Sequence, residues 1–290
     1  LEVSELVHEH AYTHSLKDAQ RLSENANKEG FDVIVAVGGD GTINGVINGF
    51  FDASGKRISE ARFGVIYTGT SPDFCKSYNL PLHLDEAFSR LLNMKVIKIP
   101  IGRIVFPAFE RDPDKDGEPK KEVKYFACCA NIGLGAALAR RANGGVRKIL
   151  GDGMGTFMSL ILTLARYKAN TFTRTIDGIE EPVGQMYNTS VGLTPYIASG
   201  IKVFLDKAGN GNCFYCMTVK GLKWYNVVPL LRKVYSGKVF ANTDYLTVRT
   251  CRIVEFHENG RNPEVEFDGD PGGFLPCHID IASDPLDLIA

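Results

Sequence analysis

The sequence predicts an N-terminal α/β domain with a parallel, Rossmann-like sheet, followed by a C-terminal β-sandwich domain. Over residues 1–100, β-branched apolar runs alternate with helical segments, as is typical of a parallel sheet covered by helices. After residue 100 helical patterns become rare, and short apolar runs are separated by Gly, Asn and Pro. A glycine-rich turn, Val37 to Thr42, also connects a predicted strand to a predicted helix.

The composition is that of an ordinary globular protein. With 290 residues, 44% of them hydrophobic and 23% charged, the chain is long enough for two domains. Its formal net charge of −1 argues against a nucleic-acid-binding protein, which would carry a basic excess. Seven scattered cysteines predict reduced thiols.

No targeting or membrane-spanning segment is visible in the sequence. No apolar run reaches the ~18 residues of a membrane span, and no signal peptide is visible in the given sequence. We therefore expect a cytoplasmic protein whose membrane contact, if any, is peripheral. Because the chain enters a helix soon after Leu1, we also expect the first strand of the sheet to lie upstream.

The elements of the first domain follow one another with clear boundaries. A helix is predicted within 14–32, because Ser15 is a suitable N-cap and Gly30 a suitable stop. Residues 31–37 (FDVIVAV) predict a buried strand, and 42–51 (TINGVINGFF) a helix that contains two glycines. A strand, a loop and a helix are then predicted at 62–68, 69–81 and 84–94.

The second domain is predicted to consist mainly of strands. Runs at 99–106 and 123–135 are joined by a charged, Pro-rich stretch, which predicts a solvated hairpin loop. Two helical interruptions are expected, at 155–168 and 221–238.

The last strand-like run, 277–283, either completes the second domain or returns to the first. We therefore place the domain limits at 1–100 and 101–275, with the C-terminal segment 276–290 as a candidate to rejoin the first domain.

The glycine-rich turn predicts an anion site. Gly38, Gly39 and Gly41 let backbone N–H groups approach a ligand closely, and the helix start at Thr42 adds a positive dipole end. Asp40 would repel a bare phosphate, so its presence indicates Mg²⁺, water or a ribose hydroxyl between them. The structural alternative is a tight turn that only requires glycines.

These residues resemble a known family. The motif GGDGTINGVINGF is similar to the nucleotide-binding motif of the diacylglycerol kinase catalytic family, which includes the bacterial soluble lipid kinases and the sphingosine and ceramide kinases. NAD kinases and phosphofructokinases share a similar Gly-Gly-Asp-Gly core. Three further stretches favour the lipid kinases: GTSPDF at 69–74, NIGLGA at 131–136 and FDGD at 267–270. The resemblance spans nearly the whole chain.

The resemblance implies an NAD-kinase-like α/β domain followed by a β-sandwich domain, with the active site in the cleft. It implies ATP- and Mg²⁺-dependent phosphorylation of a hydroxyl on a diacylglycerol- or sphingoid-like lipid at a membrane surface, by a protein that is compatible with a homodimer. The nucleotide-binding residues it implies are Thr13, Gly38, Gly39, Asp40, Gly41, Thr42, Asn44, Gly69, Thr70 and Asp73, with Asp40 also as the Mg²⁺ ligand. Asp268 and Asp270 are its implied catalytic residues, as candidate proton acceptors.

The chain also departs from the family pattern, which makes it a divergent member. Gly45 stands where the family usually has Glu, and Asp270 is one methylene shorter than the family glutamate; the other departures are Pro72, Pro100 and Asn210. Two alternatives to a lipid kinase stay open. One is another small-molecule kinase with this motif, similar to an NAD kinase. The other is a nucleotide-binding protein that transfers no phosphate.

Overall fold

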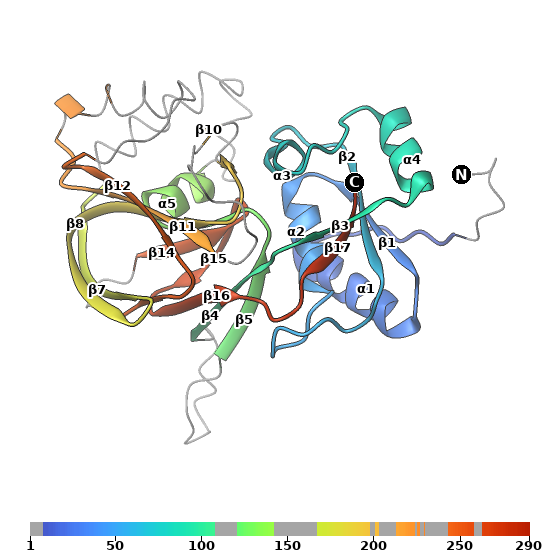
Figure 1. The fold of residues 1–290 in the computed structure, drawn as a ribbon, viewed down its shortest axis with the longest axis horizontal. Coiled ribbons are helices and arrows are strands. Elements are labelled where there is room, and N and C mark those ends of the chain that lie inside the picture. The colour runs from blue at the N-terminus through green and yellow to red at the C-terminus, as the bar shows by residue number, and fades with distance from the viewer. Residues whose placement is uncertain are drawn as a thin grey trace.

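Two large sheets organise the described residues in the computed structural model, and two further short strands, β9 (Tyr196–Ile197) and β10 (Ile201–Lys202), pair only with each other (Figure 1). The structure describes residues 8–107, 121–141, 167–197, 201–202, 213–223, 225–226, 229, 243–257 and 263–290. Within this part of the chain, no helix is long and apolar enough to cross a membrane.

The first sheet has four strands in the order β1 (Val33–Gly38), β2 (Arg62–Tyr67), β17 (Leu286–Ile289) and β3 (Val96–Ile99). β1, β2 and β17 are mutually parallel, whereas β3 runs antiparallel to β17. The associated helices are α1 (Leu16–Glu29), α2 (Asp40–Asn48), α3 (Asp73–Ser77) and α4 (Leu84–Asn93). The predicted strand–helix alternation is therefore confirmed, with α1 and α2 beside β1 and α4 beside β2.

Helix α1 has the boundaries that the sequence predicts. The Ser15 hydroxyl accepts a hydrogen bond from the Asp18 amide at 3.1 Å, which caps the first turn. Gly30 ends the helix with φ 84°, in the left-handed region that glycine favours.

The two glycines of α2 allow α1 to pack closely against it. A Cβ on Gly45 would lie 2.9 Å from Ala19 Cβ, and one on Gly49, directly after α2, would lie 2.5 Å from Ser23 Cβ. The Ser23 hydroxyl also donates to the carbonyl of Val46 at 2.8 Å. Close packing therefore outweighs the low helix propensity of glycine in this segment.

Four local predictions need correction. The predicted helix 42–51 begins at Asp40 and ends at Asn48, so Asp40 lies in its first turn. The predicted loop 69–81 contains α3. The strand predicted at 99–106 divides into β3 and β4 (Gly102–Pro107), because Pro100 cannot donate to a ladder. The strand predicted at 123–135 divides into β5 (Lys121–Phe126), β6 (Cys129–Gly133) and the start of α5 (Leu134–Arg141).

Strand β17 brings the C-terminus into the centre of the first sheet. Leu288 pairs with Phe63 of β2 and with Ile97 of β3, and its side chain is fully buried. The preceding strand β16 (Cys277–Ile281) remains in the second sheet, between β4 and β13 (Val254–Phe256). The strand-like run at 277–283 thus belongs to the second sheet, and the next strand crosses over; the domain limits themselves stay predictions.

Because Leu288 is buried between two strands, we expect Leu288→Ala to lower the free energy of unfolding by about 2–5 kcal/mol, through lost transfer energy and the cavity left behind. Leu92 on α4 is 54% exposed, so Leu92→Ala should change stability by less than about 0.5 kcal/mol. Urea unfolding of both variants checks this. Equal small effects would show that β17 does not contribute to the core of the first sheet.

The second sheet contains eleven described strands. β15, β14, β6, β8, β7, β13, β16, β4 and β5 follow one another, and β11 attaches β12 to β8. Phe126 stacks on Phe214 with ring centroids 5.9 Å apart in its core, and Phe172 packs edge-on against Phe256. The bounds not yet given are β7 (Asn170–Ile176), β8 (Ile179–Gly192), β11 (Phe214–Lys220), β12 (Leu246–Cys251), β14 (Glu264–Phe267) and β15 (Asp270–Phe274).

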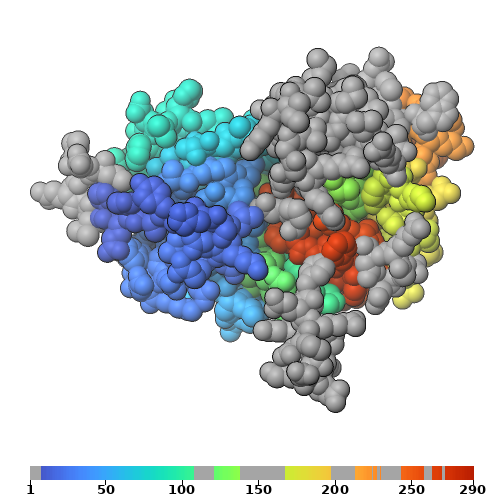
Figure 2. All heavy atoms as spheres, turned by 180° about the vertical axis from the view of Figure 1, so that it is seen from behind, coloured from blue at the N-terminus to red at the C-terminus, as the bar shows by residue number. Residues whose placement is uncertain are grey.

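The two sheets meet along α2 and β5. From behind, N-terminal residues in blue lie beside residues from the middle of the chain in green, with C-terminal residues in red next to these (Figure 2). Helix α2 contacts β5 directly, and Phe51 stacks on Tyr125 with ring centroids 4.8 Å apart. The helix predicted at 155–168 and most of that at 221–238 lie outside the described residues.

Candidate active site

The glycine-rich turn lies at the carboxyl edge of the first sheet, where the parallel strands β1 and β2 both end. Its neighbour is the loop after β2, whose Thr68 amide donates to the Gly38 carbonyl at 3.0 Å. A Cβ on Gly69 would lie only 2.6 Å from Gly39 Cα. The two loops therefore touch through the backbone of their glycines. A side chain at either glycine would push the loops apart.

Helix α2 begins at the turn without a side-chain cap. Its N-cap is Gly39, which has no side chain to accept a hydrogen bond from the amides of the first turn, although its carbonyl accepts from the Ile43 amide at 3.0 Å. Those amides and the positive end of the helix dipole are therefore available to an anion. Gly41 and Thr42 lie half-buried in this first turn, next to Asp40.

Asp40 is a half-buried carboxylate beside this turn with a raised pKa. Its Oδ2 atom accepts a hydrogen bond from the Asp73 amide at 3.3 Å. Its Oδ1 atom is buried and has no hydrogen-bond partner within the described part of the chain. Burial, followed by the nearby carboxylates of Asp73 and Asp268, raises the pKa of Asp40 to about 7. Three acidic residues distant in sequence are therefore brought together here.

This arrangement fits a Mg²⁺ ion that is shared with a phosphate ligand. A buried carboxylate oxygen without a partner, near further carboxylates, is a hard oxygen donor of the kind Mg²⁺ prefers. No cluster of three His, Cys, Asp or Glu side chains that could hold a metal ion occurs among the described residues. Mg²⁺ usually takes one or two protein carboxylates, and phosphate and water complete its coordination.

Asp268 sits in the turn between β14 and β15, and its carboxylate accepts four hydrogen bonds. The Cys128 and Cys129 amides donate to Oδ1 at 2.9 and 3.0 Å. The Ala127 amide and the Asn44 side chain donate to Oδ2 at 2.7 and 3.0 Å. Burial raises the pKa of Asp268, and these hydrogen bonds act in the opposite direction.

Asn44 points from α2 toward the second sheet and not toward the glycine turn. It is 5% exposed, and its Nδ2 atom donates to the Tyr125 carbonyl at 3.0 Å as well as to Asp268. Asn48, one turn further along α2, donates to the same carbonyl and accepts from the Tyr125 amide, each at 2.9 Å. Sequence reasoning missed Asn48, although its spacing of four residues from Asn44 places both side chains on one helix face.

The remaining predicted site residues occupy the rim of this region or lie apart from it. Thr70 is exposed in the loop after β2, and Asp73 is half-buried at the first position of α3. Thr13 is exposed in the segment that precedes α1. Asp270 is the first residue of β15, paired with Phe267, and its side chain lies outside the described part of the structure.

The departures from the family pattern have local explanations at two positions. A Glu side chain could not replace Gly45 without displacing α1, because the backbone carbonyl of Leu16 would lie 3.1 Å from an added Cβ. Pro72 occupies the N-cap position of α3. Pro100 lies between β3 and β4, and Asn210 lies outside the described residues.

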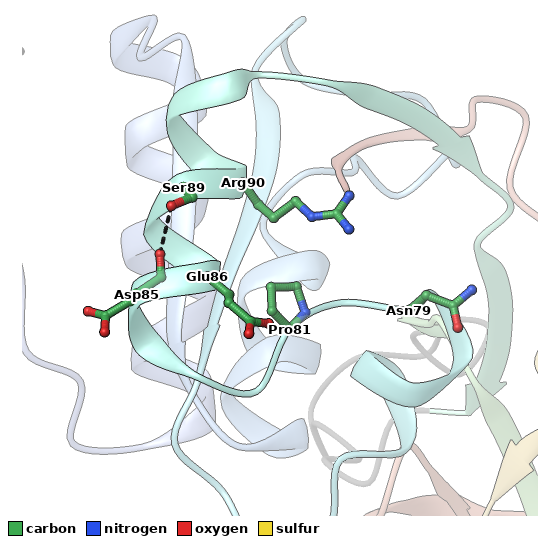
Figure 3. A pocket seen from close by; sticks show the side chains of 6 residues that line it. All are labelled: Asn79, Pro81, Asp85, Glu86, Ser89 and Arg90. Carbon is green, nitrogen blue, oxygen red and sulfur yellow. Dashed lines mark hydrogen bonds between the residues drawn. The ribbon is translucent and has the colours of Figure 1, made fainter.

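A pocket of about 460 Å³ lies apart from these residues, between α4 and the segment that follows α3 (Figure 3). Five of its six lining residues carry polar side chains, among them Asp85, Glu86 and Arg90. The Ser89 hydroxyl donates to the Asp85 carbonyl of the same helix at 2.9 Å. None of the predicted site residues lines it.

Comparison with known proteins confirms the resemblance in the N-terminal part. The family model of the diacylglycerol kinase catalytic domain matches residues 1–104. A diacylglycerol kinase from Staphylococcus aureus (strain JH9) is 33% identical over 92 residues, which is 32% of this chain and 28% of the relative's length. The match therefore spans less than a third of that protein.

Solved structures confirm the predicted fold class over most of the chain. A putative diacylglycerol kinase from Bacillus anthracis aligns with a TM-score of 0.69 and 19% identity, over 96% of this chain and 84% of that one. Yeast NADH kinase complexed with NADH aligns with a TM-score of 0.50 and 11% identity, over 90% and 62%. Both likenesses concern the fold: an N-terminal α/β domain followed by a domain of β-strands.

Proposed function

Since residues 1–104 match the diacylglycerol kinase catalytic domain, we propose that the chain is a kinase that transfers phosphate from ATP to an alcohol. The observation that carries this proposal is the buried Oδ1 of Asp40 beside the glycine-rich turn, which has no hydrogen-bond partner among the described residues. An amide-lined turn for phosphates with an adjacent carboxylate for a divalent cation is the combination that phosphoryl transfer requires.

The protein's own residues would act mainly by positioning. The amides at the start of α2 would bind the phosphates, and Asp40 would hold Mg²⁺ against them. Mg²⁺, when bound, neutralises charge on the phosphoryl group. Gly69, where a Cβ would lie 2.6 Å from Gly39 Cα, and Thr42 would border this site. Thr70 and Thr13 are further candidates for nucleotide contacts. Asp268 and Asp270 are the candidates to accept the proton of the acceptor hydroxyl.

The proposed acceptor is a lipid of the diacylglycerol or sphingoid class, taken from a membrane surface by a cytoplasmic protein. The resemblance of GTSPDF and FDGD to lipid-kinase motifs supports this substrate class over NAD. A homodimer is compatible with the proposal and is not required by it.

A substrate panel tests the proposal. Purified protein is incubated with Mg²⁺ and labelled ATP, and with diacylglycerol, a sphingoid base or NAD as acceptor. Labelled phospholipid is the expected product. Transfer to NAD alone would favour the NAD-kinase alternative, and nucleotide binding without transfer to any acceptor would favour a non-catalytic protein.

A further inference from the structure

The sequence FDGD forms a tight β-hairpin. Phe267 and Asp270 are paired, and the two residues between them both have positive φ, 50° for Asp268 and 90° for Gly269. Positive φ at both central residues is typical of a type I′ turn, for which Asp-Gly is a favoured sequence. The geometry of the turn alone therefore accounts for the sequence Asp-Gly at this position.

The chain contains a second turn of the same kind, Asp177-Gly178, between β7 and β8. Its φ values are 49° and 82°. The Asp177 amide donates to the Ile253 carbonyl at 3.0 Å, and its carboxylate accepts from the Arg252 and Ile253 amides at 2.8 and 2.9 Å.

Asp268 makes the same three contacts with the chain before β6. Its amide donates to the Cys129 carbonyl at 3.0 Å, and its Oδ1 accepts from the Cys128 and Cys129 amides. In both turns an aspartate in the left-handed region thus binds the backbone at the start of a neighbouring segment. Asp268 differs from Asp177 in being more buried and in using its second oxygen as well.

The carboxylate of Asp268 has no acceptor capacity left for a substrate. A carboxylate offers about four lone-pair sites, and four N–H groups from residues 127, 128, 129 and 44 donate to this one. Receiving the proton of a hydroxyl would require breaking at least one of these hydrogen bonds inside a buried site.

Both donor hydrogens of the Asn44 side chain are likewise used. Its amide nitrogen donates to Tyr125 and Asp268, which accounts for both hydrogens. Its Oδ1 atom accepts from Asn48 Nδ2 at 3.1 Å. A phosphate bound at the glycine turn would have to compete with contacts that connect α2 to the second sheet.

We propose that Asn44 and Asp268 are positioning residues, which together hold the start of α2 against the backbone of residues 125–129. Neither contacts phosphate nor accepts a proton. They fix the glycine turn on one sheet relative to the FDGD turn on the other. The catalytic part of this assignment rests on the proposed function. The assignment replaces the roles that the family resemblance implies for these two residues.

A double-mutant cycle in urea unfolding tests the contact without any assumption about activity. We expect Asn44→Ala and Asp268→Asn each to reduce the folding equilibrium constant about 10- to 100-fold, because buried partners are left unsatisfied. In the double variant, the reduction of the folding equilibrium constant should be at least about fivefold smaller than the product of the two single reductions. Asp177→Asn is the matched control. When it is combined with Asn44→Ala, the reduction of the folding equilibrium constant should equal the product of the two single reductions within about twofold. Multiplicative effects for Asn44 and Asp268 would overturn the proposal.

Should Asp268→Asn fail to fold, amide hydrogen exchange of Asn44→Ala alone provides the test. The Ala127 to Cys129 amides should exchange at least about tenfold faster than in the parent protein. The Arg252 and Ile253 amides, which Asp177 holds, should be unchanged. Equal exchange at Ala127 to Cys129 in both proteins would contradict the contact.

Kinetics then test the assignment of roles. Asn44→Ala and Asp268→Asn should lower kcat by factors within about fivefold of each other, and the acidic limb of the pH–rate profile should persist in both. A folded Asp268→Asn variant that loses more than about 100-fold in kcat, while Asn44→Ala does not, would identify Asp268 as a proton acceptor. Absence of turnover in the parent protein would refute the proposed kinase and leave the unfolding result intact.

Discussion

Replacing Asp40 with Asn is expected to stabilise the metal-free protein at pH 8 by about 2–4 kcal/mol, because the carboxylate is costly to bury in its charged form. The pKa of Asp40 is raised from 3.8 to about 7 in the folded protein. A raised carboxylate pKa means that the folded state binds a proton more tightly than the unfolded state. Its stabilising contribution is fully present below pH 3.8 and is lost as the pH rises toward 7.

Urea unfolding at pH 5 and pH 8, in the presence of a chelator, measures this effect. The parent protein should lose about 2–3 kcal/mol more stability between these pH values than Asp40→Asn does. Asp85→Asn, at an exposed position on α4, serves as the control and should behave like the parent protein. An Asp40→Asn variant that is less stable than the parent protein at pH 8 would show that the Asp40 carboxylate is satisfied without a cation.

The second large effect is expected for Gly69→Ala. The added methyl group would lie 2.6 Å from Gly39 Cα and 2.7 Å from the Tyr67 hydroxyl, so backbone has to move. We expect a loss of about 1–3 kcal/mol in the free energy of unfolding. Since a displacement near 1 Å can cost on the order of 100-fold in a positioned reaction, phosphoryl transfer should fall by a similar factor.

Gly184→Ala is the matched control for this substitution. Nothing lies within 4 Å of a Cβ at Gly184, so its stability and nucleotide binding should remain close to those of the parent protein. The measurements are urea unfolding and nucleotide titration of both variants. Unchanged nucleotide affinity in Gly69→Ala would argue against a ligand between the two glycine loops.

Local signals were sufficient to predict most of the first sheet and the glycine turn. Ser15 and Gly30 mark the ends of α1 by capping, which depends only on neighbouring residues. The apolar runs that became β1 and β2 were recognisable for the same reason. Asp-Gly between apolar residues was also a local hairpin signal, and the Asp177 turn shows how it could have been interpreted.

Features that depend on distant residues were not predictable in this way. The sequence indicated segment 276–290 as a candidate to rejoin the first domain, but the position of β17 between β2 and β3 is not encoded in its own four residues. Asn44 and Asp268 are 224 residues apart in the sequence. The motif resemblance placed Asn44 beside phosphate, whereas burial and hydrogen bonding direct its side chain to the other sheet.

The most direct test of the central claim is calorimetric titration of the protein with ADP, with and without Mg²⁺, for the parent chain and Asp40→Asn. The account predicts binding by the parent chain that requires Mg²⁺, and a loss of at least about 100-fold in affinity in the variant, which corresponds to roughly 2.7 kcal/mol. Absence of binding by the parent chain, or equal binding by both proteins irrespective of Mg²⁺, would contradict a Mg²⁺–nucleotide site at the turn between β1 and α2.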